Sequence, residues 1–225
     1  MLCIETATEV CSVAISNSDK LLAVREIEDA HAHSAKLTLL IQDCAKAANV
    51  TLPQLQAIAI SSGPGSYTAL RVGISTAKGL CYALDVPLIE VHTLQALALA
   101  TANQVQQFQA IYCPMIDARR MEVYAALFDA YGNPLTEVKP LVVETDAFEA
   151  YFHQGQTIIF SGNGAAKCQP ILTSPLAQFE HTKCSAVNLI APAFAYFQEN
   201  RFVDVAYFEP NYGKLPNITT PKRKW

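Results

Sequence analysis

The first half of the chain alternates between short apolar runs and segments whose apolar positions repeat with a helical period. Three β-prone runs come first and predict a meander, because a polar turn at residues 17–20 separates the second run from the third. Two further strands then alternate with three helices. The predicted strands are Leu2–Glu5, Val10–Ser16, Leu21–Ile27, Ala57–Ser61 and Leu88–Val91, and the predicted helices are Ser34–Ala48, Ser66–Leu84 and Thr93–Ala102.

The second half repeats this order of elements in a looser form. Its predicted strands are Ala110–Ile116, Met121–Phe128, Glu137–Val143 and Thr157–Ser161, and its predicted helices are Asp146–His153 and Val187–Glu199. No residue-level repeat is visible, so the order of elements alone predicts a duplication. We therefore expect an α/β chain with two lobes, residues 1–104 and 105–213, followed by a basic tail at 214–225.

Composition narrows the class of protein. The 225 residues are 51% hydrophobic and 16% charged, which indicates a folded chain, and the net charge of −4 argues against a protein that coats nucleic acid. The seven cysteines lack zinc-site spacing. No apolar stretch approaches the roughly 20 residues that span a bilayer. The N-terminus carries Glu5 and Glu9 before any basic residue, unlike a signal peptide. These features predict a reduced, cytoplasmic protein with no membrane association.

The glycine-rich segment at residues 62–67 joins a buried run to the second helix. Its N–H groups are candidates for anion binding at a helix start. The alternative is a tight turn, in which glycine supplies unusual dihedral angles and Ser66 is the N-cap. No Lys-Ser/Thr pair follows, so the segment is not a P-loop, and the residues favour the turn.

The second helix has apolar positions spaced by three and four residues, which is typical of helix–helix packing. Beside them, Ala69, Gly73 and Ala77 form a stripe of small residues that would let another backbone approach. Either both stripes face the chain's own sheet, or one of them faces a partner, and the pattern leaves both open. The candidate interface positions are Leu37, Leu40, Ile41 and Cys44 on the first helix, and Tyr67, Leu70, Arg71, Ile74, Ala77, Lys78 and Cys81 on the second.

Two predicted hairpin turns place a carboxylate at equivalent points of the two halves, Glu5 followed by Thr6 and Asp117 followed by Ala118. One large fold superfamily holds ATP phosphates and Mg²⁺ between such turns, but neither turn here has the glycine that lets phosphate approach. Gly162 and Gly164 flank an asparagine in a turn that is a weak candidate for adenosine contact. These positions mark at most a vestigial nucleotide cleft, so no cofactor is expected.

Nothing in the sequence predicts a catalytic or metal-binding residue. The five histidines show none of the recognised metal-ligand spacings, and the serines near residue 62 lack a nucleophile elbow.

Three stretches of the sequence resemble one known family. They are the opening hairpin around Ile4–Ala14, the long stretch Ser62–Leu80 and the second hairpin around Ile116–Tyr124. Together they resemble the TsaB (YeaZ) family of tRNA threonylcarbamoyladenosine biosynthesis proteins, most clearly over about residues 1–128. The resemblance implies a two-lobed fold of the actin, sugar-kinase and Hsp70 kind, with ribonuclease H-like lobes.

The resemblance also implies a non-catalytic partner subunit. Members of this family pair with a catalytic paralogue, TsaD, and an ATPase, TsaE, in a complex that transfers a threonylcarbamoyl group to N6 of the adenosine beside the anticodon. Pairing uses the first two helices in a four-helix bundle, which implies a homodimer when the paralogue is absent. Contact with tRNA is then made only through the complex.

The catalytic metal of the paralogue gives a check on this implied role. The paralogue binds its metal through the last two histidines of a Val-His-His-x-x-x-His run. Set on residues 91–97 of this chain, those two positions are Thr93 and Leu97, which leaves His92 alone. Leucine cannot coordinate a metal, so the resemblance implies that this chain has no metal site.

Two enzymatic alternatives share the fold. An ATP-dependent phosphotransferase would bind ATP–Mg²⁺ and lose that binding in Asp117→Ala, and a metalloprotease would need a bound metal. The chain departs from the family pattern in having Glu5 where Asp is usual and in its longer basic tail. Direct reading of tRNA by that tail is a third alternative, since its basic residues are Lys214, Lys222, Arg223 and Lys224.

Overall fold

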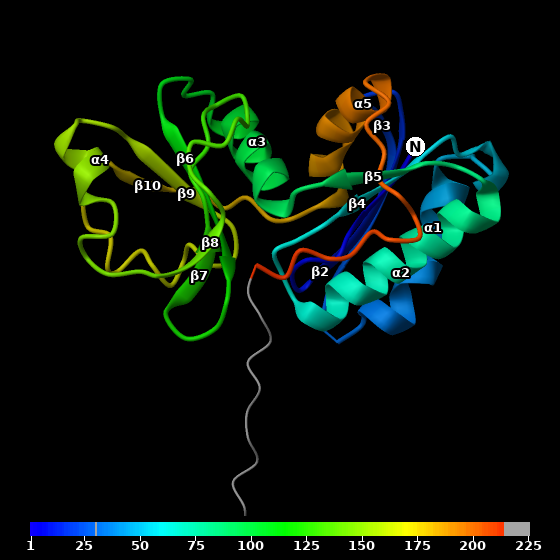
Figure 1. The fold of residues 1–225 in the computed structure, drawn as a ribbon, viewed down its shortest axis with the longest axis horizontal. Coiled ribbons are helices and arrows are strands. Elements are labelled where there is room, and N and C mark those ends of the chain that lie inside the picture. The colour runs from blue at the N-terminus through cyan, green and yellow to red at the C-terminus, as the bar shows by residue number, and fades with distance from the viewer. Residues whose placement is uncertain (30, 214–225) are drawn as a thin grey trace, which may run out of the picture.

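Two five-stranded mixed sheets form the framework of the computed structural model, which describes residues 1–29 and 31–213 (Figure 1). The predicted basic tail at 214–225 lies outside the described residues. The first sheet contains β1 (Leu2–Glu5), β2 (Val10–Asn17), β3 (Lys20–Glu28), β4 (Ile58–Ser61) and β5 (Leu88–Val91). The second contains β6 (Ile111–Asp117), β7 (Glu122–Ala125), β8 (Lys139–Val142), β9 (Ile158–Ser161) and β10 (Ala177–Phe179).

The two sheets have the same topology. The first has the order β3-β2-β1-β4-β5. The second, read from its β8 edge, has the order β8-β7-β6-β9-β10, so the equivalent strands occupy the same places in both sheets. In each sheet the first three strands pair antiparallel and the last two join in parallel. The predicted duplication into two ribonuclease H-like lobes is therefore confirmed.

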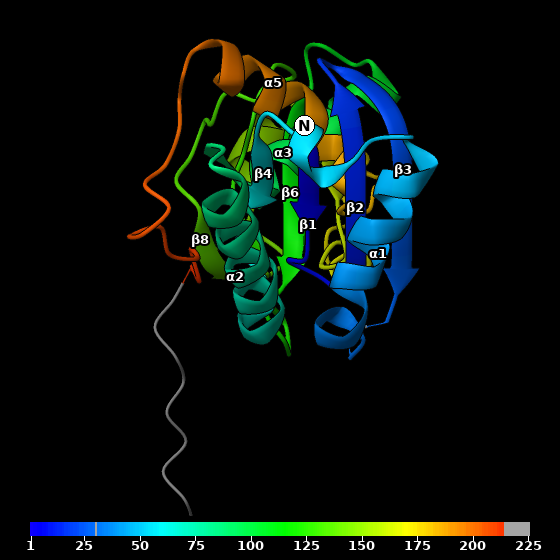
Figure 2. The same cartoon turned by 90° about the vertical axis from the view of Figure 1, so that its right-hand side faces the viewer.

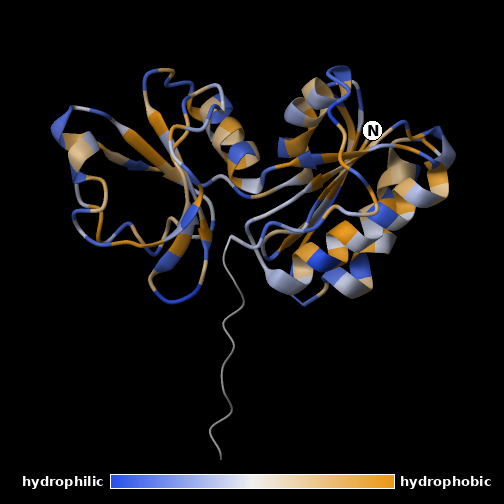
Figure 3. Cartoon of the chain, in the orientation of Figure 1, coloured by the Kyte–Doolittle hydropathy of each residue, from blue (hydrophilic) through white to orange (hydrophobic). Residues whose placement is uncertain are grey.

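Helices on both sides cover the sheets. The chain has α1 (His33–Ala47), α2 (Tyr67–Leu84), α3 (Thr93–Val105), α4 (Glu149–His153) and α5 (Ile190–Gln198), with 3-10 turns at Leu52–Gln54 and Ala186–Leu189. Figure 2 shows α1 and α2 side by side on one face of the first sheet. Apolar residues are concentrated in the strands (Figure 3). The buried residues of α1 and α2 are mostly apolar as well, as burial of a core requires.

Two helices pack on the sheet of the opposite half. The third helix, α3, follows the first sheet in the chain, but Leu94, Leu97 and Ala102 join the core of the second sheet with Tyr112 and Ile159. Conversely, α5 and the 3-10 turn before it pack on the first sheet. The lobes therefore interlock, and neither sheet is covered only by helices from its own half of the sequence.

The last described residues return to the first lobe. We call residues 199–213 the C-terminal strap. Its Val203 N–H donates to the Leu88 carbonyl at 3.0 Å, and its Asn211 N–H donates to the Ser62 carbonyl at 2.8 Å. The strap therefore runs from the edge of β5 past α2 to the space between the lobes (Figure 1).

The structure differs from the predicted elements mainly in the second half. Strand β10 was not predicted, because only three residues pair and all are half-buried, which leaves no alternating pattern. The predicted helix Val187–Glu199 begins as a 3-10 turn and continues as α5. Pro192 lies in the first turn of α5, where its missing N–H breaks no helical hydrogen bond.

Candidate partner surface and interlobe cleft

Most of the predicted interface positions face the chain's own core. Side chains at most 3% exposed are Leu37, Ile41, Cys44, Leu70, Ile74, Ala77 and Cys81, and all of these except Leu70 belong to the core cluster between the two helices and the first sheet. Leu40 and Lys78 are half-buried, and Tyr67 and Arg71 are exposed. The seven buried residues therefore pack inside the chain. A partner that contacts this helix pair would meet its outer, exposed side.

The predicted stripe of small residues also faces inward, where it brings α2 close to the turn after β1. A Cβ atom at Gly73 would lie 2.2 Å from Thr6 Oγ1, and one at Gly65 would lie 2.3 Å from the Ala7 carbonyl oxygen. Only glycine fits at this separation. The small residues therefore set the distance between α2 and the first hairpin.

A second stripe of small residues lies on the outer side of α2. Ser75, Gly79 and Ala83 are spaced by four residues and are all exposed. A Cβ at Gly79 would meet no atom within 4 Å. The same two helices also carry exposed apolar side chains: Leu39 on α1 is 48% exposed, and Tyr82 on α2 is 88% exposed. The four-residue spacing was visible in the sequence, but which of the two stripes points outward was not.

The C-terminal strap occupies the polar margin of the predicted interface. The Arg71 guanidinium lies 4.3 Å from the ring centroid of Tyr67, and its Nε donates to the Tyr212 hydroxyl at 2.7 Å. Lys78 Nζ donates to the carbonyls of Ala206 and Phe208 at 3.0 and 3.1 Å. The residues joined by these strap hydrogen bonds are more than 120 positions apart in the sequence. Contacts over such separations produce no periodic pattern, so the sequence did not indicate them.

The glycine-rich segment before α2 is a turn whose amides are used internally. Ser66 N donates to the Ala7 carbonyl at 2.7 Å, and Gly63 N donates to Thr93 Oγ1 at 3.1 Å. Ser66 occupies the N-cap position, but its side chain makes no capping hydrogen bond. These contacts favour the turn over an anion site.

Glu5 lies at the end of β1, only 1% exposed. Its Oε1 accepts hydrogen bonds from Ala7 N at 2.6 Å and from Ser61 Oγ at 2.8 Å. Burial raises the pKa of this carboxyl to about 7, although both hydrogen bonds favour the charged form. A side chain enclosed in this way stabilises the turn and is not presented to a ligand. Thr6, next to it, is also buried, against Gly73.

Asp117, at the end of β6, is exposed and paired within the second lobe. Its carboxylate receives a hydrogen bond and ion pair from Lys167. Lys167 also donates to the carbonyls of Arg120 and Glu122, each at 2.7 Å. The position where a metal–phosphate group would need a free carboxylate is therefore occupied by a lysine ammonium.

A single asparagine connects the two hairpin turns across the lobes. Asn163 Oδ1 accepts from Asp117 N at 3.0 Å, and Asn163 Nδ2 donates to Glu9 Oε2 at 2.7 Å. The glycines on either side fit closely against β6, because Cβ atoms at Gly162 and Gly164 would lie 2.4 Å from the Met115 carbonyl oxygen and 3.0 Å from the Ile116 carbonyl carbon. Both glycines thus have a packing role.

One small cavity lies beside the two turns. The cavity lined by Thr8, Glu9, Gly162 and Asn163, among others, has a volume of about 150 Å³. Sites for small molecules and cofactors typically measure about 300–1,000 Å³. This cavity by itself is too small for a nucleotide.

Comparison with known proteins then decides the family. Residues 27–220 match the family model described as TsaD: tRNA N6-adenosine threonylcarbamoyltransferase. The whole chain is 28% identical to the tRNA threonylcarbamoyladenosine biosynthesis protein TsaB of Bacillus subtilis, over 97% of that protein. This chain belongs to the TsaB (YeaZ) family. The predicted family membership is therefore confirmed.

Solved structures agree with this assignment. YeaZ from Pseudomonas aeruginosa superposes with a TM-score of 0.76 at 26% identity, covering 94% of this chain and 98% of that one. The activator of the 2-hydroxyisocaproyl-CoA dehydratase from Clostridium difficile, solved with bound ADPNP, covers 88% of this chain and 94% of that one, at a TM-score of 0.52 and 7% identity. The latter shows the shared fold alone, which is the expected actin, sugar-kinase and Hsp70 type.

The two positions of this TsaB-family chain that were compared with the metal ligands of TsaD, Thr93 and Leu97, have structural roles. Thr93 accepts the hydrogen bond from Gly63 N, and Leu97 is buried in the second core. In the part of the chain that the structure describes, no group of three or more His, Cys, Asp or Glu side chains is placed to hold a metal. Nor do residues 1–29 and 31–213 include a helix long and apolar enough to cross a bilayer.

Proposed function

We propose that this chain is a non-catalytic scaffold subunit of the assembly that forms N6-threonylcarbamoyladenosine in tRNA. It binds the catalytic transferase subunit TsaD through the outer side of α1 and α2 and works with the ATPase TsaE. The chain contacts tRNA only as part of that assembly. In the absence of TsaD, the same surface pairs with a second copy of this chain.

The observation that carries this proposal is the exposed glycine on α2. A glycine inside a helix costs roughly 1 kcal/mol relative to alanine. Gly73 has an internal reason for that cost, because Thr6 leaves no room for a side chain, whereas Gly79 faces open space. A partner helix that packs on Ser75, Gly79 and Ala83 supplies the missing reason, since small residues allow close approach of two backbones.

The exposed apolar side chains of α1 and α2 support the same surface. Leu39 and Tyr82 expose apolar groups on a helix pair whose inner side is already filled. Aromatic residues near the centre of an interface are frequent binding hot spots. An interface of standard size buries about 800 Å² on each partner, which two helices of 15 and 18 residues are long enough to supply.

The cleft supports a scaffold over the two enzymatic alternatives. An ATP-dependent phosphotransferase needs room for a nucleotide and a carboxylate available to Mg²⁺. Instead Lys167 neutralises Asp117, and the cavity measures about 150 Å³. A metalloprotease needs imidazole or carboxylate ligands where this chain has Thr93 and Leu97.

The first test is the light-scattering mass of this chain alone and mixed with TsaD from the same organism. We expect a homodimer of 24.5 kDa chains that converts to a one-to-one heterodimer. Gly79→Lys places a long charged side chain in the contact and should weaken both associations at least about tenfold, or roughly 1.4 kcal/mol. Lysine is a better helix former than glycine, so the variant should remain folded.

Ala191→Lys is the matched control, because it also puts lysine in place of a small exposed residue, on α5. It should leave both associations unchanged. If Gly79→Lys binds TsaD as tightly as the unmodified chain, the partner surface lies elsewhere. A charge at Leu70 or Ile74 would not make this test, because both are buried in the chain's own core and such a variant loses the fold.

A further inference from the structure

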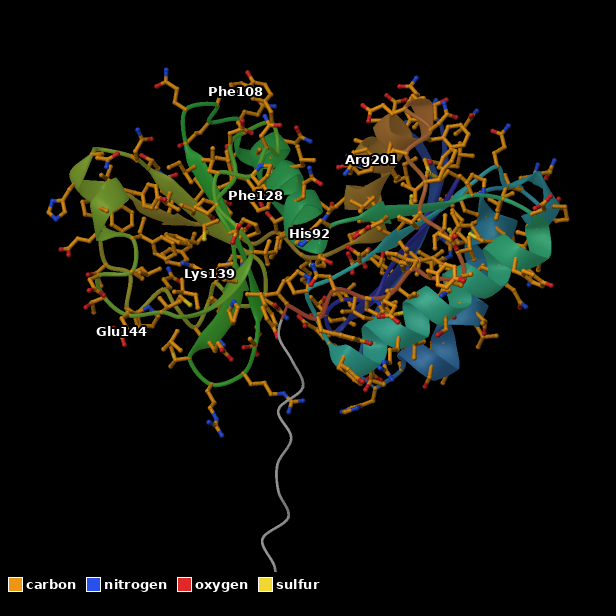
Figure 4. All side chains as sticks on the ribbon, viewed as in Figure 1. His92, Phe108, Phe128, Lys139, Glu144 and Arg201 are labelled. Atoms are coloured by element: carbon orange, nitrogen blue, oxygen red, sulfur yellow. The ribbon has the colours of Figure 1, made fainter. Side chains whose placement is uncertain are left out.

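A groove between the lobes lies apart from the α1–α2 surface and from the Glu5 and Asp117 turns. It has a volume of about 700 Å³. The first lobe and α3 contribute His92, Gln95, Tyr196 and Arg201, and the second lobe contributes residues 134–138 over Phe128. A smaller cavity of about 200 Å³ continues from it toward Glu90 and Val203. Figure 4 shows His92 and Phe128 facing the space between the lobes, with Arg201 at its first-lobe side.

One wall of the groove is apolar and exposed. Leu135 is 52% exposed, Pro134 is also exposed, and Val138 lies half-buried beside them. Leaving this wall in water costs free energy in proportion to its apolar area. The groove therefore favours an occupant with large apolar side chains.

Besides Gln95, Thr136 and the Tyr196 hydroxyl, the polar groups that line the groove and its extension are two carboxylates, an imidazole and a guanidinium. Glu137 and Glu90 lie at different ends of the combined cavity. Burial lowers the pKa of His92, which keeps its ring neutral, and its Nδ1 is buried without a hydrogen-bond partner. The Arg201 guanidinium lies 4.1 Å from the ring centroid of Tyr196. Among the lining residues of the groove, Arg201 carries the positive charge that would repel a basic occupant. It lies on the first-lobe side of the groove, away from Glu137.

We propose that residues 214–225 of this chain dock into this groove in cis. The segment reads Lys-Leu-Pro-Asn-Ile-Thr-Thr-Pro-Lys-Arg-Lys-Trp, with four basic residues, no acidic residue and three large apolar residues, Leu215, Ile218 and Trp225. Its apolar side chains match the wall at Leu135, and its cations match Glu137.

The described chain ends within reach of the groove. A Cβ at Gly213 would lie 2.7 Å from the Tyr124 ring and 3.3 Å from the Pro64 side chain, so Gly213 lies between the lobes. Tyr124 pairs with Pro140 on β8, two residues beyond Val138. Twelve residues span at most about 40 Å when extended. The segment is therefore long enough to follow the groove from Val138 toward Arg201, touching both lobes.

Trp225 is the only tryptophan in the sequence and reports directly on this segment. In the full chain we expect blue-shifted emission and an acrylamide quenching constant several-fold lower than that of a free 214–225 peptide. Glu137→Lys and Leu135→Lys should each restore quenching toward the free-peptide value. Leu22→Lys, at a similarly exposed leucine on β3, should leave it unchanged. Circular dichroism of each variant checks that the fold is retained.

Three outcomes would overturn the proposal. Quenching equal to that of the free peptide means that the segment does not dock. Protection that grows with protein concentration means that it docks on a second copy, and protection that appears only when tRNA is added means that it binds a polyanion. None of these depends on the α1–α2 surface, so the result is independent of TsaD binding.

Discussion

Glu5 occupies a candidate nucleotide-binding position, but its carboxyl is buried inside the protein. The sequence placed a carboxylate at the end of the first strand, and the structure confirms that position. Its burial could not be predicted, because it depends on Ser61 and the turn before α2, which are more than 50 residues away. Glu5 interacts electrostatically with the Cys11 and Cys184 thiols, and burial raises the pKa of both, so they remain neutral.

The raised pKa of Glu5 makes stability depend on pH. The carboxyl has a pKa of about 7 in the folded chain against 4.5 in a model peptide. The folded state therefore binds more protons between these values, and stability present below pH 4.5 is lost as pH rises through 7. Glu5→Gln keeps an oxygen to accept from Ala7 and Ser61 without the buried charge. It should raise the free energy of unfolding at pH 8 by about 1–3 kcal/mol.

Urea titrations at pH 5 and pH 8 measure this effect. The gain in Glu5→Gln should be larger at pH 8, and the difference between the two pH values should be smaller than in the unmodified chain. Asp117→Asn is the control, because that carboxylate is exposed and paired with Lys167. A gain of equal size at both pH values would show that Glu5 is not protonated in this range.

At the scale of elements, the two glycines of α2 lie six residues apart and have opposite environments. Gly73→Ala places a methyl group 2.2 Å from the buried Thr6 Oγ1, so β1 and α2 must separate. It should destabilise the chain by about 1–3 kcal/mol, the usual cost of overpacking. Gly79→Ala meets open space and should stabilise the chain by roughly 0.5–1 kcal/mol. Urea unfolding measured below the concentration of dimer formation tests both; equal signs would contradict the assigned faces.

Most elements of the first half could be predicted because each has a strong local pattern. Strand β4 is apolar on both faces, and α2 carries an unbroken three–four spacing over Tyr67–Leu84. The pattern could not say which stripe of α2 turns inward, since both contain small residues. That depends on a contact with Thr6, from another element. The strap against Arg71 and the short strand β10 were missed for the same reason, because long-range contacts alone define them.

At the scale of the whole molecule, the exchange of helices joins the two lobes. The duplicated order of elements predicted two sheets, and both are present. Periodicity shows that a helix has an apolar face but not which sheet covers it. Chain order therefore could not predict that α3 completes the second core while α5 completes the first. Asn163, which bonds to both hairpin turns, adds a polar link between the same lobes.

This exchange predicts that the lobes unfold together. If α3 leaves the second sheet, Thr93 and Ala96 also lose their contacts with the first lobe. If α5 leaves the first sheet, the strap beside α2 loses its anchor. Calorimetry of the monomer should therefore show one transition, with equal calorimetric and van't Hoff enthalpies.

Leu97→Ala and Leu189→Ala remove buried side chains from opposite cores and should each lower stability by about 2–5 kcal/mol without splitting that transition. Leu22→Ala, at an exposed position, should change stability by less than about 0.5 kcal/mol. Two transitions, with Leu97→Ala shifting one and Leu189→Ala the other, would mean that the exchanged helices do not couple the lobes.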